Sequence, residues 1–326
     1  MREVAFIKQN KEKWLEFEQA IFGKSNKNPD EMANLYIHLV NDLSYAQTYY
    51  PKSKTVVYLN HLAATIYQKI YKTKRTESNR LVYFFKEEVP LIVYQNRRYL
   101  LYSFLMFFLF VLIGIVSTRY DSGYVRMFLG DAYVNETYKN IRDGNPVAIY
   151  KSGSNWGSFI GITLNNLEVG AKCYLYGVFA GIGTFVYYLQ NCVMLGTFQY
   201  MFYEKGVLLK SMQGIWIHGC MEIFGIIIEA AAGFMLGAAI LFPKTYSRMD
   251  SFKIGFQNSF KIFLSTIPFT IAAGFLEGYV TRYALEMPLW LDMFIIFFTL
   301  AIISFYYLIY PKIVFNKVYK NTNIHG

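Results

Sequence analysis

A run of 20 residues without a charged side chain constrains this chain more than any other feature. Residues 99–118 read YLLYSFLMFFLFVLIGIVST and contain no Asp, Glu, Lys or Arg. An α-helix of this length crosses the hydrocarbon core of a bilayer, which is about 30 Å thick. Inside that core only helices and closed barrels satisfy their backbone hydrogen bonds. The sequence therefore predicts an all-α, polytopic membrane protein whose first transmembrane helix covers residues 99–118.

Half of the basic residues lie before this run. Residues 1–98 hold 16 of the 32 Lys and Arg and 10 of the 22 Asp and Glu. The net charge of +10 could indicate nucleic-acid binding, but no motif for it is present, and membrane proteins collect Lys and Arg in cytoplasmic loops. We therefore expect the lipid bilayer as a partner, and no nucleic acid. Arg97 and Arg98, directly before the run, place the N-terminus in the cytoplasm.

The region before the first span is predicted to be helical and water-exposed. Apolar residues recur at helical spacing in KWLEFEQAIF, and Tyr50-Pro51 ends a later helix because proline disfavours the helical conformation of the residue before it. We predict a cytoplasmic helical region over residues 1–80, with helices at 13–22, 31–49 and 54–72, a turn at 23–30 and a polar linker at 72–80.

Two amphipathic segments flank the first span. Residues 81–98 are rich in aromatic side chains and contain Pro90, and we predict an interfacial elbow helix that lies on the membrane surface. Residues 119–154 carry 5 basic and 4 acidic side chains. We predict that they form an extracytoplasmic amphipathic segment.

Residues 155–311 are predicted to form a transmembrane bundle. The stretch 155–242 is long enough for three spans, or for two spans and a re-entrant pair, with a break near Glu204. Basic residues place both 243–261 and the tail 312–326 in the cytoplasm. Because both termini are then on one side, the number of spans is even. We predict about six, some of them broken or re-entrant.

Three predicted spans carry pairs of glycines four residues apart. In lipid, small residues at this spacing let two helix backbones approach closely. The pairs favour packing within the bundle, and contacts between copies in a homo-oligomer are the alternative. The glycines are Gly177, Gly181, Gly233, Gly237, Gly274 and Gly278.

Polar side chains within the predicted spans form the candidate site. His218, Glu222 and Glu229 share one helix face because they are spaced by four and seven residues. A charge at bilayer depth costs about 2.5–3.5 kcal/mol, so such groups face the protein interior. The set is either a polar clamp that holds broken helices together or part of a path through the bundle. Its members are Asn165, Asn166, Glu168, Asn191, His218, Glu222, Glu229 and Glu277.

The sequence contains no recognisable catalytic constellation. It has no Walker loop, HExxH, GxSxG or dinucleotide-binding fingerprint. Cys173, Cys192 and Cys220 lie in apolar stretches without paired spacing and are expected to be buried. His218 and Glu222 could share a metal ion, but the sequence offers no convincing third ligand. We therefore predict no cofactor, no metal and no enzymatic activity.

The order NN, GIGT, HGxxE and AAxxxEG along the membrane half resembles the stage II sporulation protein M family. The N-terminal half resembles an extended branch of that family without a role in sporulation. One departure is Cys192, since the family's usual pair is Asn-Gly, and this puts a sharp helix break after Asn191 in doubt. The matching residues are Asn165, Asn166, Gly177, Gly181, Ile182, Gly183, Thr184, Asn191, Gly196, His218, Gly219, Glu222, Gly233, Gly237, Ala272, Ala273, Glu277 and Gly278, and, before the membrane, Trp14, Asp42, Leu43, Tyr50, Pro51, Tyr58, Leu59, Asn60, Ile66 and Tyr67.

The resemblance implies a multi-pass protein of the bacterial inner membrane. In spore formers the founding member resembles a scaffold that brings peptidoglycan-degrading enzymes to the septum. The extended branch implies RDD-type membrane proteins and MoxR-like ATPases as partners, and a role in envelope maintenance or stress tolerance. We therefore expect a non-enzymatic membrane scaffold or complex subunit. A transporter or channel with a polar intramembrane path, and a membrane-remodelling protein acting through its amphipathic segments, are the alternatives.

Overall fold

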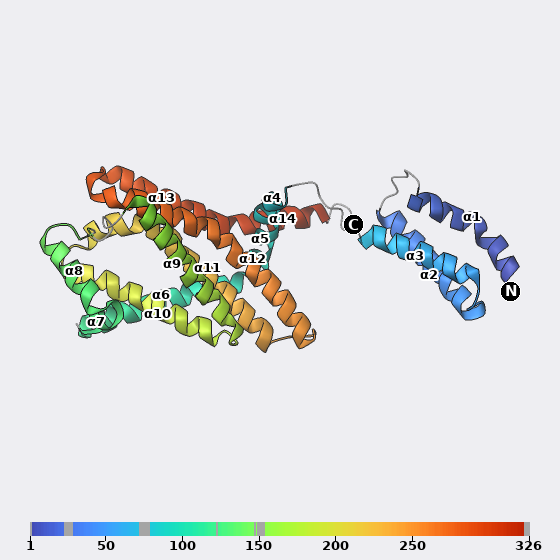
Figure 1. Ribbon diagram of the computed structural model, residues 1–326, viewed down its shortest axis with the longest axis horizontal. Coiled ribbons are helices and arrows are strands. Elements are labelled where there is room, and N and C mark those ends of the chain that lie inside the picture. The colour runs from blue at the N-terminus through green and yellow to red at the C-terminus, as the bar shows by residue number, and fades with distance from the viewer. Residues whose placement is uncertain are drawn as a thin grey trace. The chain divides into compact units, whose positions relative to one another are not determined.

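The computed structural model describes residues 2–22, 29–71, 79–121, 123–146, 148 and 154–322, and every regular element in these ranges is a helix (Figure 1). The predicted all-α class is therefore confirmed. The chain divides into two compact units, Met1–Arg80 and Leu81–Gly326, each with its own hydrophobic core. Most of the predicted turn at 23–30 and of the linker at 72–80 lies outside the described residues.

The first unit consists of three helices, α1 (Glu3–Phe22), α2 (Pro29–Tyr49) and α3 (Lys54–Tyr71). The three predicted helices are thus confirmed, although the first begins ten residues earlier than the periodicity indicated. Trp14 and Leu59 are buried between them, and the Trp14 indole donates a 2.9 Å hydrogen bond to Asp42. Burial of such aromatic and aliphatic side chains stabilises the unit in water.

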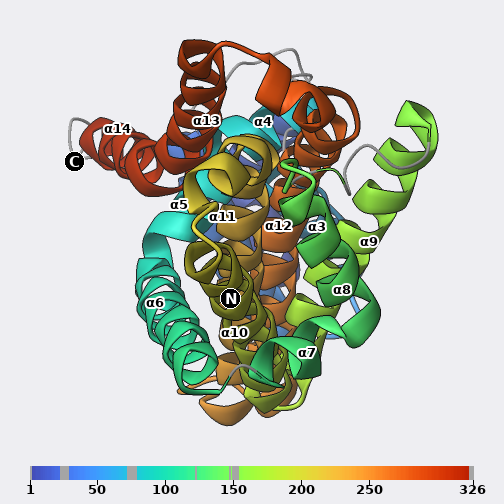
Figure 2. The same cartoon turned by 90° about the vertical axis from the view of Figure 1, so that its left-hand side faces the viewer.

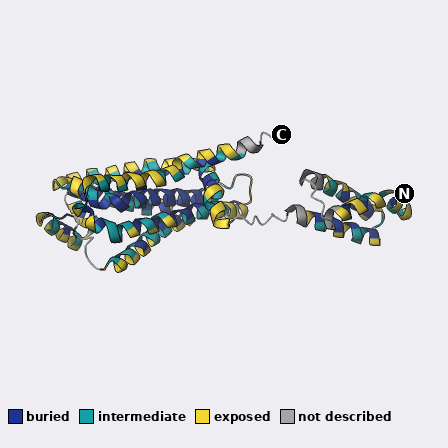
Figure 3. Ribbon diagram, turned by 90° about the horizontal axis from the view of Figure 1, so that it is seen from above, coloured by how far each residue is buried: buried dark blue, intermediate teal, exposed yellow. Residues whose placement is uncertain are grey.

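The second unit is built around one long helix, α11 (Leu208–Leu241). It runs through the middle of the unit, and its residues are the most continuously buried (Figures 2 and 3). Around it, within the described residues, pack α6 (Arg97–Tyr120), α9 (Asn155–Leu175), α10 (Ile182–Glu204), α12 (Arg248–Phe275) and α13 (Leu289–Ser304).

Four helical stretches of the described residues are long and apolar enough to span a membrane. They are Arg97–Tyr120, Leu208–Leu241, Arg248–Glu286 and Leu289–Val318. The helices α9 and α10 have 21 and 23 residues, so each is more than about 30 Å long, but they are not among these four stretches. A six-span bundle would need α9 and α10 as its remaining spans, so the predicted count stays a prediction.

The elbow before α6 is attached to the protein. It comprises α4 (Arg80–Tyr83), a π-helix η1 (Phe84–Glu88) and α5 (Val89–Gln95), and Val89 and Val93 lie in the core of the unit. The C-terminal segment, the π-helix η6 (Phe305–Ile309) followed by α14 (Tyr310–Thr322), packs against it.

Three polar contacts hold this elbow in place. The hydroxyls of Tyr306 and Tyr310 donate to the backbone carbonyls of Phe85 and Lys86 at 3.0 and 3.1 Å, and Lys261 forms a 2.8 Å ion pair with Glu88. The segment predicted to lie on the membrane surface therefore has one face bound to the bundle, because its valines and backbone carbonyls find partners there.

The chain reverses direction in a tight turn between α9 and α10. A 3-10 turn, η3 (Tyr176–Val178), is followed by Gly181, which has a φ of +80° that suits glycine. Thr184 donates a 2.7 Å hydrogen bond to the carbonyl of Cys173 and so joins the start of α10 to the end of α9. No break occurs at Asn191, which lies inside the continuous helix α10 and donates to the carbonyl of Tyr187.

The predicted glycine pairs lie at contacts within the bundle. A Cβ atom on Gly177 would collide with the backbone of Gly233, and one on Gly237 would lie 2.5 Å from the Cα of Gly181. The broken helix and α11 therefore touch at the level of their backbones. On the other side of α9, Gly278 faces Phe159, and a Cβ on Gly274 would meet Thr163.

A further close contact involves two glycines that the pattern of pairs did not single out. A Cβ on Gly114 of α6 would lie 3.0 Å from the backbone nitrogen of Thr197, and one on Gly196 of α10 would lie 3.0 Å from the carbonyl carbon of Val111. The helices α6 and α10 are thus also in backbone contact. The available signal was Gly114 with Thr118, two small residues four apart within the first span.

Candidate polar site in the membrane unit

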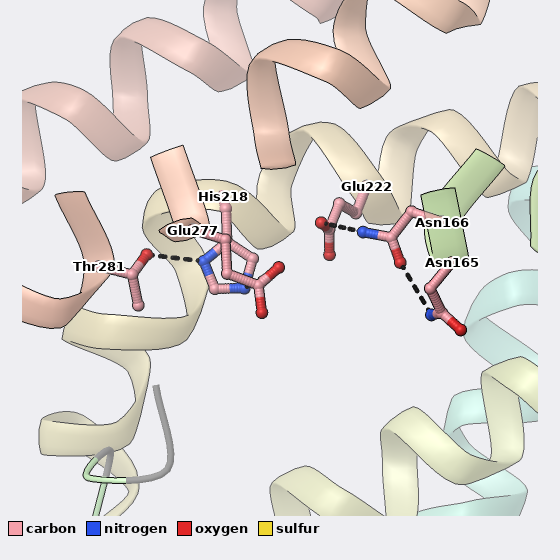
Figure 4. Close-up of polar contacts among 6 residues, drawn as sticks. All are labelled: Asn165, Asn166, His218, Glu222, Glu277 and Thr281. Carbon is pink, nitrogen blue, oxygen red and sulfur yellow. Dashed lines mark hydrogen bonds and ion pairs between the residues drawn. The ribbon is translucent and has the colours of Figure 1, made fainter. Parts of the chain in front are cut away.

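Asparagine and glutamate from two helices meet near the middle of the second unit (Figure 4). Asn166 of α9 donates a 2.5 Å hydrogen bond to the carboxylate of Glu222 on α11, and Asn165 donates to the side-chain oxygen of Asn166 at 3.5 Å. Because the two asparagines are adjacent, only Asn166 reaches α11 directly. This contact ties α9 to α11.

His218 lies one helical turn before Glu222 on the same face of α11 and is 3% exposed. Its Nδ1 atom makes a 2.9 Å hydrogen bond with the hydroxyl of Thr281, and its Nε2 atom lies 3.7 Å from the carboxylate of Glu277. The Thr281 hydroxyl contacts Nδ1, and Nε2 on the other side of the ring faces the Glu277 carboxylate.

Glu277 and Thr281 reach the site from the irregular end of α12. After Phe275 the helix widens into a π-helix, η4 (Leu276–Val280), and then tightens into a 3-10 helix, η5 (Thr281–Glu286). A π-helical turn shifts the register of the side chains that follow it and is frequent at functional sites. Here Glu277 belongs to the π-helix and Thr281 begins the next segment, and the two contact the same histidine.

The three ionisable groups converge. One ligand atom each from His218, Glu222 and Glu277 can be chosen so that all lie within 4.8 Å of one another. Two carboxylates this close repel each other in a medium of low polarity. The arrangement therefore requires a positive charge, which a proton or a bound cation can supply.

The site borders two cavities. One, of about 580 Å³, is lined by His218, Glu222 and Glu277 and is covered by Phe128 and Tyr133. These last two belong to the short helices α7 (Gly123–Leu129) and α8 (Asp131–Arg142), which follow the first span. The second, of about 220 Å³, continues past Glu222 toward Asn191, Glu229 and Thr270. Both share the wall formed by Asn165, Asn166 and Glu222.

Two of the predicted polar residues lie apart from this convergence. Glu229 is 5% exposed, accepts a 2.8 Å hydrogen bond from Thr266 and sits against Gly170. It lies about two turns beyond Glu222 on α11 and forms a separate contact with α12. Asn191 lines the smaller cavity but bonds to its own helix.

Glu168 does not belong to the cluster. It forms a 2.6 Å ion pair with Lys172, and both side chains are largely exposed. Side chains two positions apart on a helix point in directions that differ by about 200°. Glu168 therefore points away from the face on which Asn166 meets α11. The prediction grouped it with its neighbours by position in the chain alone.

Sequence reasoning missed the hydroxyl partners and one buried acid. Thr281 and Thr266 were not selected because threonine is common in membrane helices, and only their contacts with His218 and Glu229 reveal a role. Asp292, in the first turn of α13, is fully buried, and its carboxylate has no hydrogen-bond partner among the described residues. A lone acid in the apolar run LWLDMFII was a usable signal.

A family model described as stage II sporulation protein M matches residues 103–282. The chain belongs to the stage II sporulation protein M family. A second model, described as a domain of unknown function (DUF8413), matches residues 4–72. No curated protein and no solved structure matches the chain.

The two matches follow the division of the molecule. The stage II sporulation protein M match begins in α6, ends in η5 and includes every residue of the polar site. The DUF8413 match covers the three helices of the first unit. The polar site therefore belongs to the part of the chain that the family model covers, and the first unit is matched by a different model.

Proposed function

We propose that this chain is a non-enzymatic subunit of a protein complex in a bacterial inner membrane, with both termini in the cytoplasm and a role in envelope maintenance or stress tolerance. The observation that carries the proposal is the first unit, which is folded around its own core and matched by its own family model. A separately folded helical unit attached to a membrane bundle is a suitable arm for a cytoplasmic partner. An RDD-type membrane protein and a MoxR-like ATPase are the partners we propose.

The contacts of the bundle support a structural role. Buried hydroxyls lock helices together: Tyr188 donates to the carbonyl of Ser103 at 3.0 Å, and Ser251 donates to the carbonyl of Ala239 at 2.7 Å. With the hydrogen bond from Thr184 to the carbonyl of Cys173, these contacts join α10 to α6, α12 to α11 and α10 to α9. Such locked hydroxyls hold the bundle in shape, as a scaffold requires.

The first unit offers apolar surface for a partner. Val57 on α3 is 71% exposed, and Ala64, two turns later on the same face, is exposed as well. Isolated exposed apolar residues are common, so the surface needs a direct test.

The test is capture of partners from native membranes with a tagged full-length chain, compared with residues 81–326 alone. We expect both proteins to insert and only the full chain to retain its cytoplasmic partner. Val57→Glu should weaken capture, and Gln9→Glu, an exposed polar position on α1, should not. Identical partner sets from the full chain and from residues 81–326 would contradict the proposal.

A second function, transport of a small solute or ion, is favoured by one observation. The cavity of about 580 Å³ reaches buried carboxylates between helices, as a polar path would require. In liposomes containing the purified protein, transport predicts ion or proton flux that Glu222→Gln and Glu277→Gln abolish. If no flux is detected and partner capture is normal, the transport function is rejected and the scaffold role stands.

A further inference from the structure

We propose that His218, Glu222 and Glu277 form a binding site for a divalent transition-metal ion, with Zn²⁺ as the representative ion. The proposal is independent of the scaffold role, since a metal can either stiffen the bundle or take part in transport. It rests on the geometry of the three side chains, on the groups that orient them and on the cavity beside them.

The distances are close to those that a metal requires. Zinc binds histidine nitrogen and carboxylate oxygen at about 2.0–2.2 Å, so neighbouring ligand atoms lie about 3–3.5 Å apart. The Nε2 atom of His218 and the Oε2 atom of Glu277 are 3.7 Å apart, and all three ligand atoms lie within 4.8 Å. The distances between the three ligand atoms would have to shorten by about an ångström to suit a metal. Rotation of the Glu222 and Glu277 side chains can supply this change.

Two of the ligands are held by further polar groups, as in known metal sites. Thr281 occupies the Nδ1 atom of His218 and leaves Nε2 for the metal. Asn166 donates to one oxygen of Glu222. The two contacts come from different elements, η5 and α9. Hydrophobic packing alone could bring two carboxylates together. It would not require the hydrogen bonds that orient His218 and Glu222.

Charge and access point to a cation. When both are ionised, two carboxylates within the bundle carry two negative charges, which a dication neutralises at the point where they meet. Three protein ligands leave coordination positions open for water, and the cavity of about 580 Å³ adjoins all three side chains. The imidazole ligand favours Zn²⁺ over Mg²⁺ and Ca²⁺, which prefer oxygen donors alone.

The experiment is metal titration of the full-length protein in lipid nanodiscs after removal of metals by a chelator. We expect saturable binding of one Zn²⁺ per chain, a rise in melting temperature on binding, and little response to Mg²⁺. His218→Gln and Glu277→Gln should weaken Zn²⁺ binding by at least about 100-fold. Asn166→Ala and Thr281→Val, which keep all three ligands, should weaken it by about 10–100-fold.

The controls separate this site from other carboxylates. Glu229→Gln replaces a buried acid of the same helix outside the trio, and Glu168→Gln replaces an exposed one, so both should bind Zn²⁺ within about twofold of the unchanged chain. Wild-type protein that fails to bind Zn²⁺ saturably would overturn the proposal and indicate that a proton balances the pair. Equal binding by wild type, His218→Gln and Glu277→Gln would overturn it as well.

Discussion

The two units of this protein both bury apolar side chains, but they differ in what they expose and in which small and polar residues they bury. In the first unit Trp14, Leu39 and Leu59 are buried, and none of the described charged residues is buried. In α6 of the second unit the exposed residues include Leu105 and Phe108, whereas a serine and a threonine of the same helix, Ser103 and Thr118, are buried.

This contrast shows which interactions determine the buried residues of each unit. In water, removal of apolar surface drives folding, so aromatic and aliphatic side chains collect inside. In lipid that force is small between helices, and close packing and hydrogen bonds decide which face turns inward. In the second unit, buried glycines and hydroxyls therefore lie beside buried apolar residues such as Phe107 and Ile228.

The largest effect should come from truncating the apolar core of the first unit. Leu59→Ala is expected to destabilise that unit by about 2–5 kcal/mol because it removes a fully buried side chain and leaves a cavity. Thermal unfolding of the full chain measures the change. Val57→Ala, at an exposed position of the same helix, is the control and should cost less than about 0.5 kcal/mol. Equal losses from both substitutions would refute the assignment of the core.

Enlarging a glycine should produce the next effect, now in the membrane unit. Gly177→Val is expected to cost about 1–3 kcal/mol or more, because its Cβ would meet the backbone of Gly233. Resistance to protease in nanodiscs measures the loss. Gly161→Ala on α9 has open space around its Cβ position and should be tolerated. If the two variants resist protease equally, the backbone contact is wrong.

The sequence predicted the helices of both units better than it predicted their contacts. Hydropathy locates Arg97–Tyr120, and the break before Pro51 follows from a local steric rule. The convergence of Glu277 with His218 could not be predicted, since the two residues are 59 positions apart and the π-helix that aligns them has no reliable sequence signal. Glu168 was misplaced because position in the chain does not give the direction of a side chain.

A smaller effect should follow from removing one hydroxyl at the broken helix. Thr184→Val keeps the shape of the side chain but leaves the carbonyl of Cys173 without its donor. Hydrogen bonds of this kind between membrane helices contribute about 0.6 kcal/mol on average. Unfolding in detergent should show a loss of that order. The matched substitution Thr245→Val, at an exposed position between α11 and α12, should leave stability unchanged, and an equal loss there would contradict a specific role for Thr184.

The smallest effect is a pH dependence confined to the first unit. Hydrogen bonds from Ser53 and Thr55 lower the pKa of Glu3 below its ordinary value of 4.5. The stabilisation is therefore complete above pH 4.5 and is lost as the pH falls through the lowered pKa of the folded state. Glu3→Gln should flatten this part of the profile of melting temperature against pH. An unchanged acid limb in Glu3→Gln would show that another carboxylate is responsible.

The most direct test of the account is thermal unfolding of the full chain in nanodiscs, followed by hydrogen exchange in both units. We expect two separate unfolding transitions, one for each unit. Leu59→Ala should lower only the transition in which α1, α2 and α3 lose protection, and Gly177→Val only the one in which α9, α10 and α11 lose it. A single transition that both substitutions shift equally would contradict two units that are each stabilised by a core of their own.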